Sequence, residues 1–159
     1  MELQVLTPAP AAEAPVLRPA LAADHAALVN VWRRSVKASH DFLAPGAIEE
    51  IEAEVRRALA AVAEVWLVEA GGEPVAFLGC TGPHVDMLFV APRHFRRGLG
   101  TRLLDHARRR HGPLSVEVNE ANTAAHAFYR ARGFVLAGRS PVDSQGRPYP
   151  LLRLRQGDA

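Results

Sequence analysis

The chain has 159 residues, of which 48% are hydrophobic and 23% charged, a balance typical of one globular domain with a buried core. The sequence has no apolar run of about 18 residues and no N-terminal signal pattern, so it predicts neither a membrane-spanning nor a secreted protein. The formal net charge of +2 is too small to indicate a nucleic-acid partner, and Cys80 is the single cysteine, so no disulfide framework is expected. We therefore expect a cytoplasmic protein.

The first part of the chain changes from irregular to helical periodicity. Residues 1–15 are rich in alanine and proline and are expected to form a flexible leader before a single domain over residues 16–155. A short strand is expected at 16–18. Apolar residues then recur every three or four positions over 25–37 and again over 48–61, which predicts two helices.

Alternating short apolar segments and helical segments follow in the rest of the chain. Glycine and proline pairs punctuate these segments and mark turns. Strands are expected over 65–69, 75–80, 84–90, 114–118, 134–139 and 149–154, and helices over 99–111 and 122–132. This order predicts a mixed α/β domain built on one central sheet.

The most informative segment joins the strand at 84–90 to the helix at 99–111. A basic loop leads to Gly98 and Gly100, which open the helix. A helix N-terminus presents unpaired N–H groups and a partial positive charge, so this loop predicts an anion site. The sequence excludes a Walker-type loop, and Leu103 stands where a dinucleotide fingerprint needs its third glycine.

Two motifs of the second half resemble the GNAT acetyltransferases. Pro92, five residues and then Gly-Leu-Gly at 98–100 are similar to the acetyl-CoA loop of that family. The block that starts at Asn122 and ends in Tyr129-x-x-x-Gly-Phe at 129–134 is a second, independent match. Segments 35–43 and 138–152 resemble one bacterial branch of the family, and the whole resemblance covers residues 17–154.

The resemblance implies both a fold and an activity. The fold would be a central, mostly antiparallel sheet with a splayed parallel strand pair and flanking helices. The activity would be direct transfer of an acetyl group from acetyl-CoA to a primary amine of a small molecule, a peptide or a protein. The bacterial branch favours a peptide or protein amine.

Catalytic roles follow from the same resemblance. It places the acid that protonates the departing thiolate at Tyr129, whose phenol stays protonated at neutral pH. Glu117 is the candidate base. His84 and Asp86 are its rivals, since alternate residues of a strand share one face, and a water chain is a further possibility.

The resemblance also implies a cofactor site and an acceptor site. The expected cofactor-binding residues are Leu88, Phe89, Val90, Phe95, Arg96, Arg97, Gly98, Leu99, Gly100, Thr101, Asn122 and Tyr129. Phe95 departs from the family, which has Gln or Arg there, so Arg96 or Arg97 would supply the lost contact. The expected acceptor-site residues are His40, Asp41, Phe42, His84 and Asp86.

Two other classes of function stay open from the sequence. A GNAT-fold module could bind coenzyme A without catalysis, and the arginines from Arg93 to Arg110 would also suit a nucleic-acid-binding protein. The arginines cluster at a glycine turn instead of along one helix face, so we expect no nucleic acid and no membrane partner. The seven histidines lack metal-ligand spacing, so no metal is expected. A monomer or a homodimer is expected.

Overall fold

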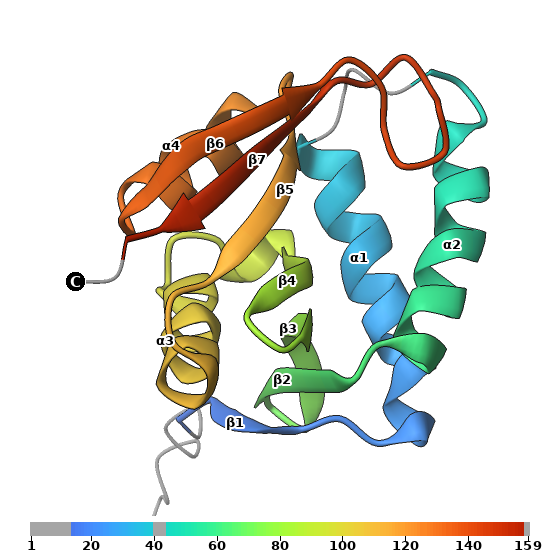
Figure 1. Ribbon diagram of the computed structural model, residues 1–159. Coiled ribbons are helices and arrows are strands. Elements are labelled where there is room, and N and C mark those ends of the chain that lie inside the picture. The colour runs from blue at the N-terminus through green and yellow to red at the C-terminus, as the bar shows by residue number, and fades with distance from the viewer. Residues whose placement is uncertain (1–13, 40–43, 158–159) are drawn as a thin grey trace, which may run out of the picture.

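The computed structural model describes residues 14–39 and 44–157 (Figure 1). Most of the expected leader and the acceptor candidates His40, Asp41 and Phe42 therefore lie outside the described residues. In the described part of the chain, seven strands form one sheet in the order β1-β2-β3-β4-β5-β7-β6. The strands are β1 (Val16–Pro19), β2 (Glu64–Ala70), β3 (Glu73–Thr81), β4 (His84–Val90), β5 (Ser115–Asn119), β6 (Phe134–Ser140) and β7 (Leu151–Gln156).

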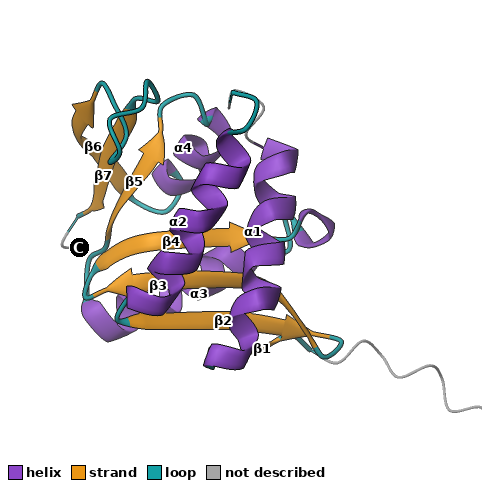
Figure 2. Ribbon diagram, turned by 90° about the vertical axis from the view of Figure 1, so that its right-hand side faces the viewer, coloured by secondary structure: helices purple, strands orange, loops and turns teal. Residues whose placement is uncertain are grey.

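Within residues 14–39 and 44–157, four α-helices cover the sheet. They are α1 (His25–Ser39), α2 (Ala47–Ala61), α3 (Leu99–His111) and α4 (Thr123–Arg130). Helices α1 and α2 lie on one face of β1–β4, and α3 lies behind those strands (Figure 2). One-turn 3-10 helices, Ala22–Asp24 and Pro92–His94, precede α1 and the α3 loop.

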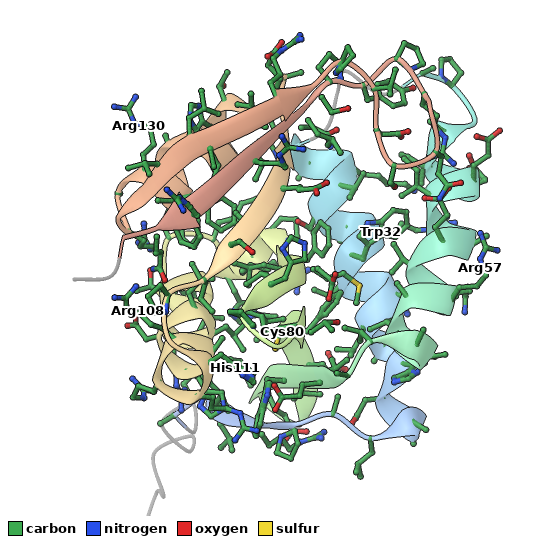
Figure 3. All side chains as sticks on the ribbon, viewed as in Figure 1. Trp32, Arg57, Cys80, Arg108, His111 and Arg130 are labelled. Carbon is green, nitrogen blue, oxygen red and sulfur yellow. The ribbon has the colours of Figure 1, made fainter. Side chains whose placement is uncertain are left out.

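The alternation of side chains along the strands divides the interior into two cores. Leu67 and Phe77 pack towards α1 and α2 together with Trp32, which is 1% exposed (Figure 3). Their sequence neighbours Val68 and Leu78 pack in the other core, with α3 and α4. Because successive residues of a strand point to opposite faces, one apolar run serves both layers.

The parallel strands β4 and β5 separate soon after they meet. They pair only at His84 with Ser115 and at Val85 with Val116. Beyond that point β4 stays paired with β3 as far as Val90, and β5 stays paired with β7. The edges of β4 and β5 that face each other are left open, so the expected mixed sheet with a splayed parallel pair is confirmed.

Element boundaries differ from the sequence expectation by one or two residues at most ends, and only the strand at 84–90 and the helix at 99–111 match at both ends. The last strand begins at Leu151 instead of residue 149, because Pro150 has no N–H and the Tyr149 amide donates to the Arg147 carbonyl. Helix α4 is shorter than expected at both ends, with Asn122 as its N-cap. Across the described residues, the helices are too short or too polar to cross a membrane.

Candidate active site

A cleft of about 750 Å³ opens where β4 and β5 diverge, a size typical of sites for small molecules and cofactors. It is lined by Ser35, Asp86, Met87, Leu88, Phe89, Val90, His94, Phe95, Arg96, Gly98, Leu99, Gly100, Thr101, Val116, Glu117, Val118, Asn119, Asn122, Ala124, Ala125, Phe128, Tyr129 and Arg132. The walls therefore come from the splayed strands, the loop before α3 and its first turn, and α4, and Ser35 is the contribution of α1.

The N-terminus of α3 forms one end of this cleft. Gly98 takes a left-handed conformation (φ 76°) that turns the chain into the helix, and the Arg102 amide makes the first helical hydrogen bond, to the Gly98 carbonyl at 2.9 Å. The amides of Leu99, Gly100 and Thr101 precede that bond and have no acceptor within the helix. Arg96 is also left-handed (φ 64°), the one non-glycine residue of the described chain with positive φ. The helix N-terminus and Arg96 give this end of the cleft a positive electrostatic character.

Gly100 is needed for close packing and not for an unusual φ. A Cβ built at this position would lie 3.0 Å from Cζ of Phe128, which also lines the cleft. The Arg132 guanidinium stacks over the Phe128 ring at 3.9 Å. It also donates to the Thr101 hydroxyl at 2.6 Å and to the Phe128 carbonyl at 2.9 Å. Arg132 thus ties α4 to the first turn of α3.

Tyr129 is the most deeply buried ionisable group of the cleft. It is 5% exposed, and its ring packs edge-on against Phe128 and Phe134, with centroids 5.2 Å and 5.1 Å away. Burial raises the pKa of the Tyr129 hydroxyl above its ordinary value. The phenol is therefore a neutral hydrogen-bond donor at physiological pH.

Two carboxylates and one amide lie on the facing walls. Glu117 is an exposed residue of β5, and Asp86 accepts a hydrogen bond from the Thr81 hydroxyl at 2.9 Å. The Asn122 side chain caps α4 by accepting from the Ala125 amide at 3.1 Å. Since Tyr129 also lines the cleft, its side chain and the two carboxylates border one space.

Not every predicted site residue lies on the cleft wall. Within the described part of the chain, only Arg97 and His84 of the predicted set are absent from the lining. His84 instead makes a 2.8 Å hydrogen bond between its Nδ1 and the Ser115 hydroxyl, where β4 and β5 are still paired. The sequence reasoning missed Phe128 and Arg132, although both belong to the motif that contains Tyr129.

The loop between β6 and β7 lies against α2, beside its N-terminal end (Figure 1). Arg147 of this loop forms ion pairs with Glu54 and, at 3.6 Å, with Glu50 of α2, and it also bonds Asp143 within the loop at 3.2 Å. The Tyr149 hydroxyl accepts a hydrogen bond from the Ala44 amide at 3.1 Å. The loop is therefore fastened to the segment between α1 and α2 and to α2 itself.

The splayed sheet with a glycine-opened helix at its split defines the class of protein. The sequence profile described as "Acetyltransferase (GNAT) domain" matches residues 61–136. A curated N-acetyltransferase is 44% identical over a match that spans 88% of its length. The chain belongs to the GNAT family and is an N-acetyltransferase.

That relative is the peptidyl-lysine N-acetyltransferase YjaB of Salmonella typhimurium, and the match covers 80% of this chain. The solution structure of apo-form YjaB from Escherichia coli superposes with a TM-score of 0.84 at 37% identity, covering 92% of this chain and 99% of that one. The expected resemblance to this branch is confirmed. An N-acetyltransferase from Thermoplasma acidophilum, solved in complex with coenzyme A, shares the fold at a TM-score of 0.68 and 16% identity, covering 90% of this chain and 98% of that one.

Proposed function

We propose that the protein transfers the acetyl group of acetyl-CoA to a lysine side-chain amine of a peptide or protein. The observation that carries the proposal is the cleft between β4 and β5, which is lined by a helix N-terminus, the buried Tyr129 and two carboxylates. The 44% identity to a peptidyl-lysine N-acetyltransferase supports the choice of acceptor. A cytoplasmic location belongs to the same proposal, since a thiol coenzyme stays reduced there.

The residues present fit acetyl-CoA. The open edge of β4 at Leu88, Phe89 and Val90 offers backbone groups to an extended pantetheine arm, and the start of α3 offers amides to the pyrophosphate. Arg96 lies beside these amides and supplies the positive charge that Phe95 lacks. When bound, acetyl-CoA supplies the thioester that is cleaved.

The lysine amine must lose a proton to attack the thioester, and the chain offers groups for both proton transfers. Glu117 takes the proton from the amine, directly or through water, and its negative charge also attracts the cationic lysine. Tyr129 donates its hydroxyl hydrogen to the sulfur as the carbon–sulfur bond breaks. The buried phenol suits this role because burial keeps it protonated. Asp86 is the alternative base from the opposite wall.

A product assay tests the proposal directly. The purified protein is incubated with acetyl-CoA and a lysine-containing peptide with a blocked N-terminus, and mass spectrometry locates the added acetyl group. We expect the lysine to be acetylated, and we expect little acetylation of a matched peptide in which arginine replaces lysine. Acetylation confined to an unblocked N-terminus would overturn the lysine assignment.

Calorimetric titration with acetyl-CoA separates catalysis from binding. We expect one-to-one binding in the micromolar range. Binding without transfer to any amine would identify a non-catalytic coenzyme A module, and no binding together with strongly salt-dependent DNA affinity would favour the nucleic-acid alternative.

Light scattering during the same purification distinguishes a monomer from a homodimer.

A further inference from the structure

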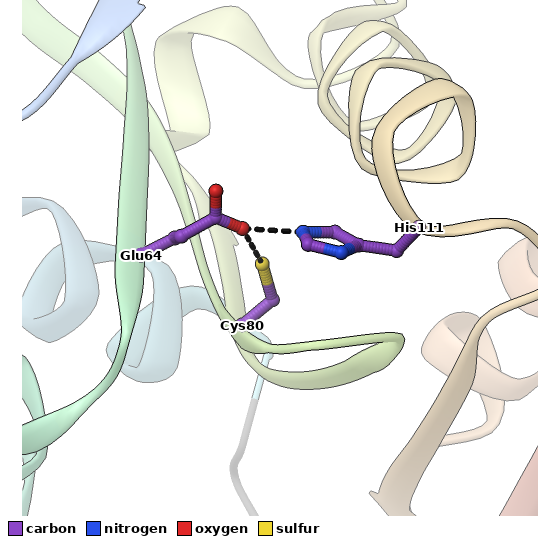
Figure 4. Close-up of side chains that lie close together, drawn as sticks. All are labelled: Glu64, Cys80 and His111. Atoms are coloured by element: carbon purple, nitrogen blue, oxygen red, sulfur yellow. Dashed lines mark hydrogen bonds and ion pairs between the residues drawn. The ribbon is translucent and has the colours of Figure 1, made fainter.

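A second polar cluster lies at the opposite end of α3 from the cleft. His111 is the last residue of this 13-residue helix, which places it roughly 18 Å along the helix axis from the cleft end. Glu64 opens β2 and Cys80 lies near the end of β3, and both side chains meet His111 there (Figure 4). One ligand atom from each residue lies within 4.8 Å of the other two.

The Cys80 thiol and the His111 imidazole converge on one carboxylate oxygen of Glu64. Oε2 of Glu64 accepts a hydrogen bond from the Cys80 thiol at 3.4 Å and also contacts Nε2 of His111 (Figure 4). The other carboxylate oxygen, Oε1, is bonded by the Arg110 guanidinium. Arg110 therefore fixes the orientation of the carboxylate and leaves Oε2 facing the thiol and the imidazole.

The donor set is the one that zinc prefers. Zn²⁺ is bound by thiolate sulfur, imidazole nitrogen and carboxylate oxygen in a tetrahedron. The bond lengths of such a site place a sulfur and an oxygen ligand about 3.5 Å apart, close to the observed 3.4 Å between Cys80 and Glu64. An imidazole nitrogen and a carboxylate oxygen bound to the same zinc ion lie about 3.3 Å apart. Nε2 of His111 and Oε2 of Glu64 are closer than this, so these two side chains must separate slightly when the metal binds.

Access and charge also suit a divalent cation. Cys80 is fully buried, whereas the side chains of Glu64 and His111 are 20% and 21% exposed and form the solvent side of the cluster. A thiolate and a carboxylate carry two negative charges towards a divalent ion, and the Arg110 guanidinium at Oε1 offsets part of the carboxylate charge. Without metal, burial and the neighbouring carboxylate raise the pKa of the Cys80 thiol to about 12, so this cysteine is not a free thiolate nucleophile.

We propose that Glu64, Cys80 and His111 form a binding site for a divalent cation of the zinc class, separate from the acetyl-transfer cleft. On binding, the Cys80 thiol releases one proton and its sulfur bonds the metal, together with Nε2 of His111 and Oε2 of Glu64, and water fills the fourth position. The bound ion links β2, β3 and the end of α3. The local histidine spacing gave no sign of this site because its ligands come from three separate elements.

Cobalt titration of the tag-free protein tests the site. Co²⁺ bound to a thiolate has a charge-transfer absorption band, which Co²⁺ bound only to histidine nitrogens lacks. We expect one equivalent of Co²⁺ to produce this band, and Zn²⁺ to abolish it. His111→Gln and Cys80→Ser should remove the band or weaken Co²⁺ binding at least tenfold. The matched control His126→Gln, on α4, should retain it.

The outcomes decide the proposal even where a variant folds poorly. His111→Gln changes a partly exposed side chain, so its fold can be verified by circular dichroism when Cys80→Ser perturbs the core. No thiolate band in the folded wild-type protein, or a band that His111→Gln leaves unchanged, would overturn the site. Bound zinc should also raise the thermal unfolding midpoint of the wild type but not of His111→Gln.

Discussion

The α3 side of the molecule, which lines one end of the cleft, and the α1–α2 side, which contributes only Ser35 to the described lining, are built by different physical means. On the α3 side, the site consists of backbone amides, glycines and close apolar packing, as at Gly98, Gly100 and Phe128. On the α1–α2 side, defined as α1, α2 and the β6–β7 loop, ion pairs add to an apolar core between the helices. Arg33 of α1 pairs with Glu52 of α2 at 2.7 Å, and Arg147 of the loop pairs with α2. Backbone geometry tolerates few substitutions, whereas ion pairs are adjustable and sensitive to pH and salt. We infer that the α3 side sets cofactor binding and the α1–α2 side sets the acceptor.

The largest effect is expected from the phenol between the two sides. Tyr129→Phe removes the proton donor and leaves the ring packing intact, so turnover should fall about 100-fold. The affinity for acetyl-CoA should stay within about twofold of the wild-type value, because the Tyr129 hydroxyl stabilises negative charge that develops on the sulfur only during the reaction. Steady-state kinetics and calorimetry measure the two quantities. Unchanged turnover would remove Tyr129 from the mechanism.

Loss of the proposed base should change the pH dependence of the reaction. Glu117→Gln keeps the size of the side chain but cannot accept the amine proton, so kcat should fall about tenfold or more and the acidic limb of the pH–rate profile should move. Asp86→Asn is the parallel variant on the opposite wall. If Glu117→Gln leaves the profile in place and Asp86→Asn shifts it, the base lies on β4 instead.

A change confined to the α3 side should weaken acetyl-CoA binding alone. Gly100→Val places a branched side chain against Phe128, which is already 3.0 Å from a built Cβ, so the dissociation constant for acetyl-CoA should rise about tenfold. Gly157→Val is the control, since an added Cβ there meets nothing within 4 Å. Equal affinities for the two variants would show that close packing at Gly100 does not shape the site.

A change on the α1–α2 side should affect the acceptor alone. Arg147→Gln releases the β6–β7 loop from Glu54, so the KM for a lysine peptide should rise about three- to fivefold while kcat and acetyl-CoA affinity change less than twofold. Arg57→Gln, at an exposed position of α2 that projects outward, is the matched control (Figure 3). A rise in the dissociation constant for acetyl-CoA in Arg147→Gln would contradict the division between the two sides.

The smallest effect concerns the start of α1. Hydrogen bonds from Arg18 and from the Leu21 amide lower the pKa of Asp24 from 3.8 to about 2. A lowered carboxyl pKa stabilises the folded state above the unfolded pKa, and this stability is lost as pH falls through the folded pKa. Asp24→Asn should therefore cost about 1 kcal/mol at pH 7, after allowance for solvent screening.

The pH dependence distinguishes this ion pair from simple loss of packing. The difference in unfolding free energy between wild type and Asp24→Asn should be constant above about pH 4 and shrink between pH 4 and pH 2. Urea unfolding at a series of pH values measures it. A difference that persists unchanged at pH 2 would assign the effect to the Leu21 hydrogen bond, which asparagine would then fail to replace.

Much of the fold followed from local patterns in the sequence. The helix at 99–111 matches α3 at both ends, because Gly98 before it and Gly112 after it stop the helical conformation whatever surrounds them. The glycine loop and the Tyr129 motif also predicted where the cleft residues stand in the chain. These features depend on neighbours within a few residues, so they can be recognised in one sequence.

The tertiary structure decided what depends on distant partners. Only the tertiary structure shows that β4 and β5 separate after two residue pairs, that Arg132 reaches Thr101, and that His84 bonds Ser115 away from the cleft lining. The cluster of Glu64, Cys80 and His111 likewise spans three elements. Local periodicity determines which residues form a helix or a strand, whereas side-chain meetings across a sheet depend on strand order and register, which no short segment encodes.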